Sequence, residues 1–137
     1  MTGAVSGFDV STSVYSQNFS VSAQEGYPTG IAFNTDGTKM FIIGLNGVDV
    51  NEYTLSTGFN VSTASYSQNF SVASQDTTPT GLAFNANGTK MFVVGVASDS
   101  VHEYTLSAGF NVSTASFVRS FSVAAQDTTP IGIAFNT

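Results

Sequence analysis

The stretch that decides the fold is PTGIAFNTDGTKMFIIG, which runs from Pro28 to Gly44. A proline opens a short apolar run, Asp36-Gly37 supplies a turn, and a second apolar run follows from Lys39. Two apolar runs joined by an Asp-Gly turn are typical of a β-hairpin. The second run, 39–44, is apolar on both faces, which predicts a strand buried between two layers.

The same stretch recurs at 79–95 and begins again at 130–137, so the chain repeats with a period of 51 residues. Ungapped comparison of 8–58 with 59–109 finds 31 identities in 51 positions. Residues 1–137 are therefore interpreted as a single repeat array: repeat 1 (8–58), repeat 2 (59–109) and a partial repeat 3 (110–137). A fixed period of this length indicates supersecondary units stacked on one another.

Each repeat predicts four short strands separated only by turns. The hairpin gives the first two strands, 28–34 and 39–44. Segments of mixed polar and apolar residues give the third strand, 50–55, and the fourth strand, 66–72. Residues 15–21 are the copy of 66–72 that lies one period earlier in the chain. The connections leave no room for a crossover helix, which disfavours a parallel sheet. The predicted fold class is all-β, a β-propeller of four-stranded antiparallel blades. Strand 28–34 is expected to be innermost, because Gly30 and Ala32 are small, and 66–72 to be the polar outer edge.

The hairpin also resembles the propeller pattern of the YVTN and NHL-like group. That group pairs a P-x-G-[IL]-A-F strand with a D-G-x-x-[LMI]-[FY]-V strand across a hairpin, and the stretches at 28–44 and 79–95 resemble this pair. The resemblance implies a propeller blade, and it implies no particular activity.

The phase of the strands along the chain predicts two complete blades, 28–72 and 79–123, and two partial ones. The outer strand 15–21 and the inner strand 130–136 have no partners in the chain, and open blade edges favour pairing with another chain. We therefore expect a homo-oligomer in which terminal strands of neighbours share a composite blade; the alternative is a fragment of a longer array. Joining Thr137 to Met1 omits the second strand and part of the third, so a ring of such copies would contain incomplete blades.

Composition excludes several classes of function. Charged residues make up 9% of the chain, the net charge is −6, and the three cations, Lys39, Lys90 and Arg119, fall one per repeat. Nucleic-acid binding needs clustered cations, so none is expected. No apolar run approaches the roughly 20 residues of a membrane span. The absence of cysteine removes disulfides and thiolate metal sites. Low charge with abundant Ser, Thr and Asn favours an extracellular or virion-surface location.

The candidate ligand-binding residues are amide-carboxylate pairs that each precede an innermost strand. In a propeller these connections crowd around one mouth of the central channel, where a ring of such side chains could hold a cation or a hydroxyl-rich ligand. The alternative is that the pairs only cap turns. The six residues are Gln24, Glu25, Gln75, Asp76, Gln126 and Asp127.

No other polar position predicts catalysis, a metal site or a cofactor. His102 is the only histidine, and Asn51 replaces it in repeat 1, so it is expected to be a structural residue on a half-exposed strand. Glu52 and Glu103 are expected to contact Lys39 and Lys90 across the strands. The Asp36-Gly37 and Asn87-Gly88 pairs are interpreted as turns, since they lack the successive oxygen ligands of a calcium loop.

The leading functional hypothesis is a non-enzymatic scaffold or recognition module, with a protein or carbohydrate ligand, from a larger surface or virion-associated protein. One alternative is a metal-dependent hydrolase of the lactonase type, and another is an engineered repeat array without a natural ligand. The segments 45–49 and 96–100 differ most between the two full repeats, as expected for loops free of core constraints. The predicted core comprises Phe33, Phe41, Ile43, Phe84, Phe92 and Val94.

Overall fold

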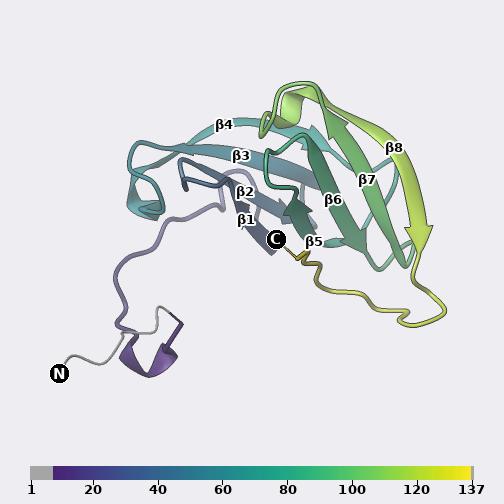
Figure 1. The fold of residues 1–137 in the computed structure, drawn as a ribbon, viewed down its shortest axis with the longest axis horizontal. Coiled ribbons are helices and arrows are strands. Elements are labelled where there is room, and N and C mark those ends of the chain that lie inside the picture. Colours follow the sequence, from purple (N-terminus) through teal and green to yellow (C-terminus); the bar gives the residue numbers. More distant parts are fainter. Residues whose placement is uncertain (1–7, 137) are drawn as a thin grey trace.

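The computed structural model describes residues 8–136, which form two four-stranded antiparallel sheets (Figure 1). The first sheet has the order β1 (Pro28–Phe33), β2 (Lys39–Gly44), β3 (Asp49–Leu55) and β4 (Ala64–Ser71). The second has the order β5 (Pro79–Phe84), β6 (Lys90–Gly95), β7 (Ser100–Leu106) and β8 (Ala115–Ser122). The predicted all-β class and the predicted strand order within each four-stranded unit are confirmed.

The turns follow the sequence signals. Gly37 and Gly88 have φ of 73° and 71°, a left-handed conformation that glycine adopts without strain. The Asp36 carboxylate accepts hydrogen bonds from the Thr38 backbone N–H at 3.0 Å and from its hydroxyl at 2.6 Å. Between the third and fourth strands lie the 3-10 turns η2 (Val61–Thr63) and η3 (Val112–Thr114), each capped by an Asn side chain. The turn η1 (Val10–Thr12), capped by Asp9, repeats this pattern in the N-terminal segment.

The main core lies between the two sheets. We call the face of the first sheet that turns to the second its front face and the opposite face its back face, and we use the same terms in the second sheet. Phe41, Ile43 and Val50 point from the front face of the first sheet. They pack against the back face of the second sheet, which contributes Leu82, Met91, Val93, Tyr104 and Leu106. A second cluster on the back face of the first sheet contains Met40, Ile42, Tyr53 and Leu55.

Half of the predicted core is fully buried. Phe41, Ile43 and Val94 are buried. The prediction of burial is wrong for Phe33, Phe84 and Phe92, which are half-buried. Their rings lie at the edges of the sheet contacts, where Phe33 meets Phe59 and Phe92 meets Phe135.

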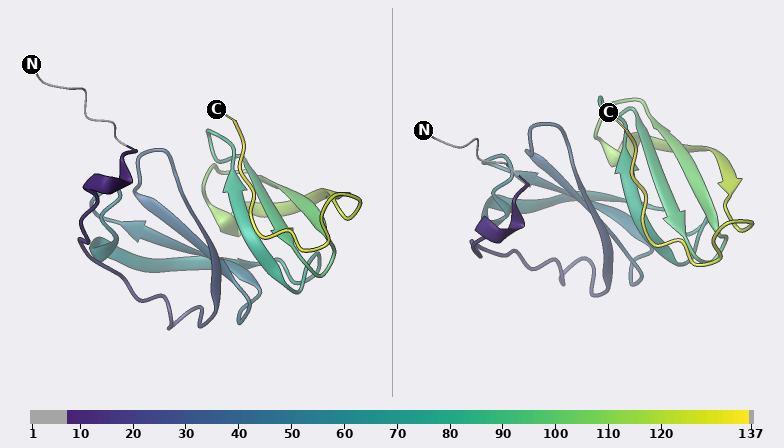
Figure 2. Two further views of the ribbon diagram at one scale, coloured as in Figure 1. Left: turned by 90° about the horizontal axis from the view of Figure 1, so that it is seen from below. Right: turned by 60° about the horizontal axis from the view of Figure 1, so that its bottom comes forward.

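The two terminal segments differ from the prediction, because neither 15–21 nor 130–136 forms a strand. A strand needs a neighbour to satisfy its backbone hydrogen bonds, and within residues 8–136 neither segment has one. Each nevertheless lies against the adjacent sheet. Phe19 packs edge-on against Tyr53 with ring centroids 5.7 Å apart, and the C-terminal segment runs beside β5 (Figure 2).

Candidate functional site

The first predicted pair, Gln24-Glu25, lies in the connection that enters β1. The Glu25 carboxylate is buried, and its oxygens accept hydrogen bonds from the backbone N–H groups of Tyr27 (2.6 Å), Asn46 (3.0 Å) and Gly47 (3.1 Å). A side chain at Gly44 would overlap this carboxylate. Glu25 therefore clamps the turn between β2 and β3 to the connection before β1.

Asp76 makes the equivalent clamp in repeat 2. Its carboxylate is buried and accepts from the Thr78 N–H (2.7 Å), the Ser98 N–H (3.1 Å) and the Ser98 hydroxyl (2.6 Å). Burial acts to raise the pKa of Asp76, but the hydrogen bonds from Ser98 and Thr78 outweigh it and hold the pKa below its ordinary value. A side chain at Gly95 would overlap the carboxylate. The glycine that ends the second strand of each repeat was the sequence signal of this close approach.

The amides of the first two pairs are bonded to buried phenols. Gln24 Oε1 accepts from the Tyr53 hydroxyl at 3.3 Å, and Gln75 Oε1 accepts from the Tyr104 hydroxyl at 3.1 Å. Burial raises the pKa of Tyr53 to about 12 and also raises the pKa of Tyr104. Both phenols therefore stay protonated and act as donors near neutral pH.

The third pair has different surroundings. Gln126 and Asp127 are exposed, and the Asp127 carboxylate accepts from the N–H of Thr129 at 2.7 Å. The structure thus brings each of the first two pairs onto a turn of its own repeat, whereas the third has no such turn beside it. The contacts of Glu25 and Asp76 are those of turn-capping residues.

A buried polar cluster surrounds His102, which sequence reasoning placed on a half-exposed strand. That placement was wrong, since only 3% of the residue is exposed. Its Nε2 lies 2.9 Å from the Ser98 hydroxyl and 3.7 Å from Asp76 Oδ2, and its Nδ1 lies 2.8 Å from the Ser120 hydroxyl. Burial lowers the pKa of His102 and outweighs the opposing attraction of Asp76. In the first sheet the equivalent volume holds Asn51 and Asn69, which both donate to Asp49.

A second polar cluster joins the first sheet to the segment that follows β7. Lys39 Nζ lies 2.7 Å from Glu52 Oε1, so the predicted Lys-Glu contact is confirmed. Glu52 Oε2 also accepts from Gln68 Nε2 (2.8 Å) and from the Val112 N–H (3.0 Å). Glu52 therefore holds repeat 1 to repeat 3 across the sheet interface.

The equivalent cluster in the second sheet is more open. Lys90 Nζ lies 2.7 Å from Glu103 Oε1, which confirms the second predicted contact, and Arg119 Nε lies 2.9 Å from Glu103 Oε2. The hydrogen bond from Lys90 is the main reason that the pKa of Glu103 lies below its ordinary value, and the charge of Arg119 adds to it. Arg119 thus bonds Glu103 where Gln68 bonds Glu52 in repeat 1.

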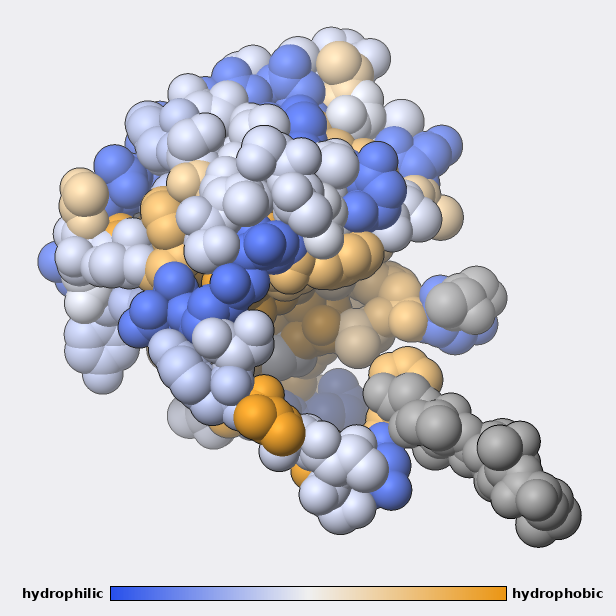
Figure 3. Space-filling view, turned by 90° about the vertical axis from the view of Figure 1, so that its left-hand side faces the viewer, coloured by the Kyte–Doolittle hydropathy of each residue, from blue (hydrophilic) through white to orange (hydrophobic). Residues whose placement is uncertain are grey.

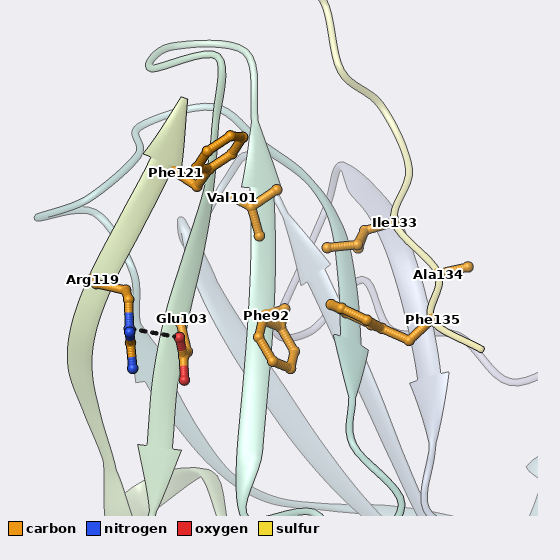
Figure 4. Close-up of a pocket in the computed structure, with 8 residues that line it drawn as sticks. All are labelled: Phe92, Val101, Glu103, Arg119, Phe121, Ile133, Ala134 and Phe135. Atoms are coloured by element: carbon orange, nitrogen blue, oxygen red, sulfur yellow. Dashed lines mark ion pairs between the residues drawn. The ribbon is translucent and has the colours of Figure 1, made fainter. Parts of the chain in front are cut away.

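An apolar pocket of about 320 Å³ lies beside these charges on the front face of the second sheet (Figure 4). Ile133 and Phe135 point from the C-terminal segment toward Phe92 and Val101, and the Glu103-Arg119 ion pair lies at the other side. Sequence reasoning did not single out this pocket, because it depends on which sheet face remains uncovered.

Two further features were sought within residues 8–136: clusters of metal-binding side chains and helices that could cross a membrane. No group of three or more His, Cys, Asp or Glu side chains is placed to hold a metal ion. Over the same residues there is also no helix with the length and apolarity to cross a membrane.

The fold and the site together define an all-β protein of two repeated four-stranded antiparallel sheets, held by buried carboxylate clamps. No protein-family model matches the chain, and no curated protein matches it. Among solved structures the chain is similar to the crystal structure of a functionally unknown protein from Desulfotomaculum acetoxidans DSM 771. The TM-score is 0.52 at 20% identity, and the match covers 69% of this chain and 27% of that one. The likeness concerns the fold alone, and the chain spans about a quarter of that protein's length.

Proposed function

We propose that this chain is a non-enzymatic recognition scaffold whose sheets are consecutive blades of a β-propeller. The observation that carries the proposal is a set of contacts between neighbouring repeats that recurs 51 residues later. The Thr29 hydroxyl donates to the Pro79 carbonyl at 2.9 Å, and the Thr80 hydroxyl donates to the Pro130 carbonyl at 2.6 Å.

The recurrence extends from the innermost strand to the outer edge. Gly30 lies against the backbone of Gly81, and Gly81 lies against the backbone of Gly132. Ring centroids are 4.5 Å apart for Phe41 and Phe84 and 4.4 Å apart for Phe92 and Phe135. At the outer edge, Phe19 and Phe70 meet Tyr53 and Tyr104 at the same centroid distance, 5.7 Å. The same contacts thus relate each repeat to the next, and glycines lie where the innermost strands approach each other. This is the arrangement expected of blades placed radially around an axis.

A recognition role is supported by the turns that the carboxylates clamp. Glu25 and Asp76 bind these turns mainly through backbone N–H groups, so the side chains of 45–48 and 96–99 can change while the anchor stays the same. These turns differ in sequence between the repeats, and Asn46, Gly47 and Ala97 are exposed. Variable loops on a rigid scaffold are a common basis of specific binding. We propose these turns as the ligand-contacting surface, within a larger surface or virion-associated protein.

The proposal is tested by activity and binding measured on the same preparation. Purified protein is expected to give no turnover of a panel of lactones and esters with added Ca²⁺, and no calorimetric signal with Ca²⁺ alone. Turnover above the buffer control would overturn the non-enzymatic role. A panel of glycans is then tested against the wild type and against a variant in which the sequence of 96–99 replaces 45–48. A bound glycan whose affinity is unchanged by this exchange would overturn the assignment of the turns.

A further inference from the structure

Within the described residues, one apolar sheet face at each end of the array is covered only in part, by a terminal segment that is not paired as a strand. On the front face of the second sheet, Phe92, Val101 and Phe121 border the pocket, and the C-terminal segment lines it as well (Figure 4). The equivalents of Phe92 and Val101 in the first sheet, Phe41 and Val50, are completely buried by the second sheet. The front face of the second sheet therefore lacks the cover that the first sheet has.

The back face of the first sheet also lacks part of the cover that the back face of the second sheet has. Ile31 is 54% exposed, whereas its equivalent Leu82 is 6% exposed because the first sheet covers it. Around Met40 and Tyr53 the cover comes from Phe19 and Val21 of the N-terminal segment. Viewed from the left-hand side of Figure 1, the molecule is hollowed and hydrophobic atoms lie within the hollow (Figure 3).

These two faces match each other in the way that the two sheets already do. The front-face residues Phe92, Val94 and Val101 stand where Phe41, Ile43 and Val50 stand in the first sheet. The back face of the first sheet repeats the residues that cover that front, with Met40 and Tyr53 for Met91 and Tyr104. The faces lie at opposite ends of one chain, so a second copy can bring them together.

We propose, resting on the blade arrangement proposed above, that two copies dock head to tail through these faces. In this arrangement, the second copy places the back face of its first sheet over the front face of the second sheet in the first copy. In the first copy, β1 of the second copy takes the position of residues 130–136. In the second copy, β8 of the first copy takes the position of residues 15–21. Both segments give way because neither is paired as a strand, whereas β1 and β8 are. The strand pattern of the sequence predicts a composite blade made of these segments, whereas the proposed docking displaces both of them.

The charged cluster at this face is consistent with such a partner. Glu52 accepts a hydrogen bond from the N–H of Val112 in the segment that follows β7, and Glu103 has no equivalent donor among its contacts in the described residues. Val61 of the second copy, which is the equivalent of Val112, would supply that N–H. Arg119, with 69% of its side chain exposed, would meet Asn60 of the second copy as Gln68 meets Asn111 at 2.7 Å. Because the contact joins two different faces, repeating it from copy to copy either closes a ring or extends a filament. Each chain contributes two complete sheets to that assembly.

Cross-linking tests the proposal directly, since the chain contains no cysteine of its own. The double variant Asn60→Cys/Arg119→Cys is treated with a short bismaleimide. Covalent species of two or more chains are expected, and light scattering at micromolar concentration should give at least twice the mass of one chain. The matched control Gln68→Cys/Asn111→Cys should link within one chain, because these side chains touch across the sheet interface.

Two further variants test the proposal. One holds the N-terminal segment in place by a cross-link, and the other places a charge on the docking face. Gln17 donates to Asn60 in the single chain, so linking Gln17→Cys to Asn60→Cys should hold the N-terminal segment in place and yield single chains. Phe121→Glu should weaken association at least about tenfold, because docking would bury the new carboxylate. Phe8→Glu, at a residue that is 98% exposed and outside the face, should leave association unchanged.

Each failure has its own signature. Single chains by light scattering and no intermolecular product from Asn60→Cys/Arg119→Cys, with the intrachain control linked, would overturn the docking and leave the blade arrangement standing. Failure of the Gln68→Cys/Asn111→Cys control to link within one chain would overturn the blade arrangement itself.

Discussion

Phe41 and Phe92 are the same residue at the same position of two repeats, yet their surroundings differ. Phe41 is completely buried between Phe84 and Phe110, whereas Phe92 is half-buried and packs against Phe135. The environment of a repeated side chain therefore depends on whether another sheet lies over it.

Substitution of the two phenylalanines should measure that difference. Phe41→Ala is expected to destabilise the protein by about 3–5 kcal/mol, as for other buried aromatic residues. In the single chain, at protein concentrations below those at which copies dock, Phe92→Ala should cost less than half as much, because part of its surface is already in water. Urea unfolding of both variants and the wild type gives the comparison. Equal losses would mean that the front face of the second sheet is covered in solution, as the head-to-tail association proposes.

His102 is expected to make stability depend on pH in mildly acidic solution. Its pKa in the folded protein lies below the ordinary value of 6.5, so the unfolded chain takes up the proton first as the pH falls. Stability is therefore fully present above about pH 6.5 and declines below it. The Asp76 pKa is also lowered, so its contribution declines only in more acidic solution, from about pH 4 downward.

The measurement is the urea midpoint at pH 7.5 and pH 5.5 for the wild type and for His102→Asn, which carries the residue of repeat 1. The wild type should lose stability between these values, and the variant should lose clearly less. An equal loss in both proteins would show that His102 is not the group that titrates.

At the scale of the element, the turns between second and third strands depend on carboxylates from a distant connection. Asp76 lies 22 residues before Ser98, yet it satisfies both the backbone and the hydroxyl of that residue. A turn anchored through its backbone keeps its shape under sequence change, which agrees with the divergence of 45–48 from 96–99.

Removing the clamp should destabilise the protein strongly in one repeat and not in the other. Asp76→Ala leaves the N–H groups of Thr78 and Ser98 without their acceptor, and buried donors of this kind cost about 1–3 kcal/mol each. Asp127→Ala is the matched control at the equivalent exposed position, and its stability should equal that of the wild type within error. Thermal or urea unfolding of the pair decides; a mild effect of Asp76→Ala would mean that water reaches the turn.

For the whole molecule, the main core joins the two sheets into one unit. Phe41, Ile43 and Val50 of the first sheet belong to the same buried cluster as Met91, Val93 and Tyr104 of the second. A shared core makes independent unfolding of either sheet costly, because each would expose the apolar face of the other.

The two sheets are therefore expected to unfold together. Hydrogen exchange followed by mass spectrometry should show β2 and β6 losing protection with the same dependence on urea, and Phe41→Ala should shift both equally. Residues 15–21 and 130–136 should exchange much faster, since they lack strand pairing. Separate transitions for β2 and β6 would contradict the single unit.

Much of the fold could be predicted because it is local. The alternation of apolar residues, the Asp36-Gly37 and Asn87-Gly88 turns and the 51-residue period determined the four strands of each repeat and their order. These signals depend on neighbours in the chain and on the two-residue period of a strand, so they can be interpreted without coordinates. The Lys39-Glu52 and Lys90-Glu103 contacts belong to the same class, because they lie on adjacent strands.

The tertiary structure decided everything that depends on what lies over a sheet face. It turned Glu25 and Asp76 onto the backbone of distant turns, buried His102 beside Ser98, and left Phe92 half-buried and Gln126 exposed. It also left 15–21 and 130–136 unpaired, although the identical pattern forms strands at 66–71 and 79–84. Repeats of nearly one sequence share local preferences, but burial and strand pairing come from neighbouring repeats, and within residues 8–136 the first and last copies contact a neighbour on one side.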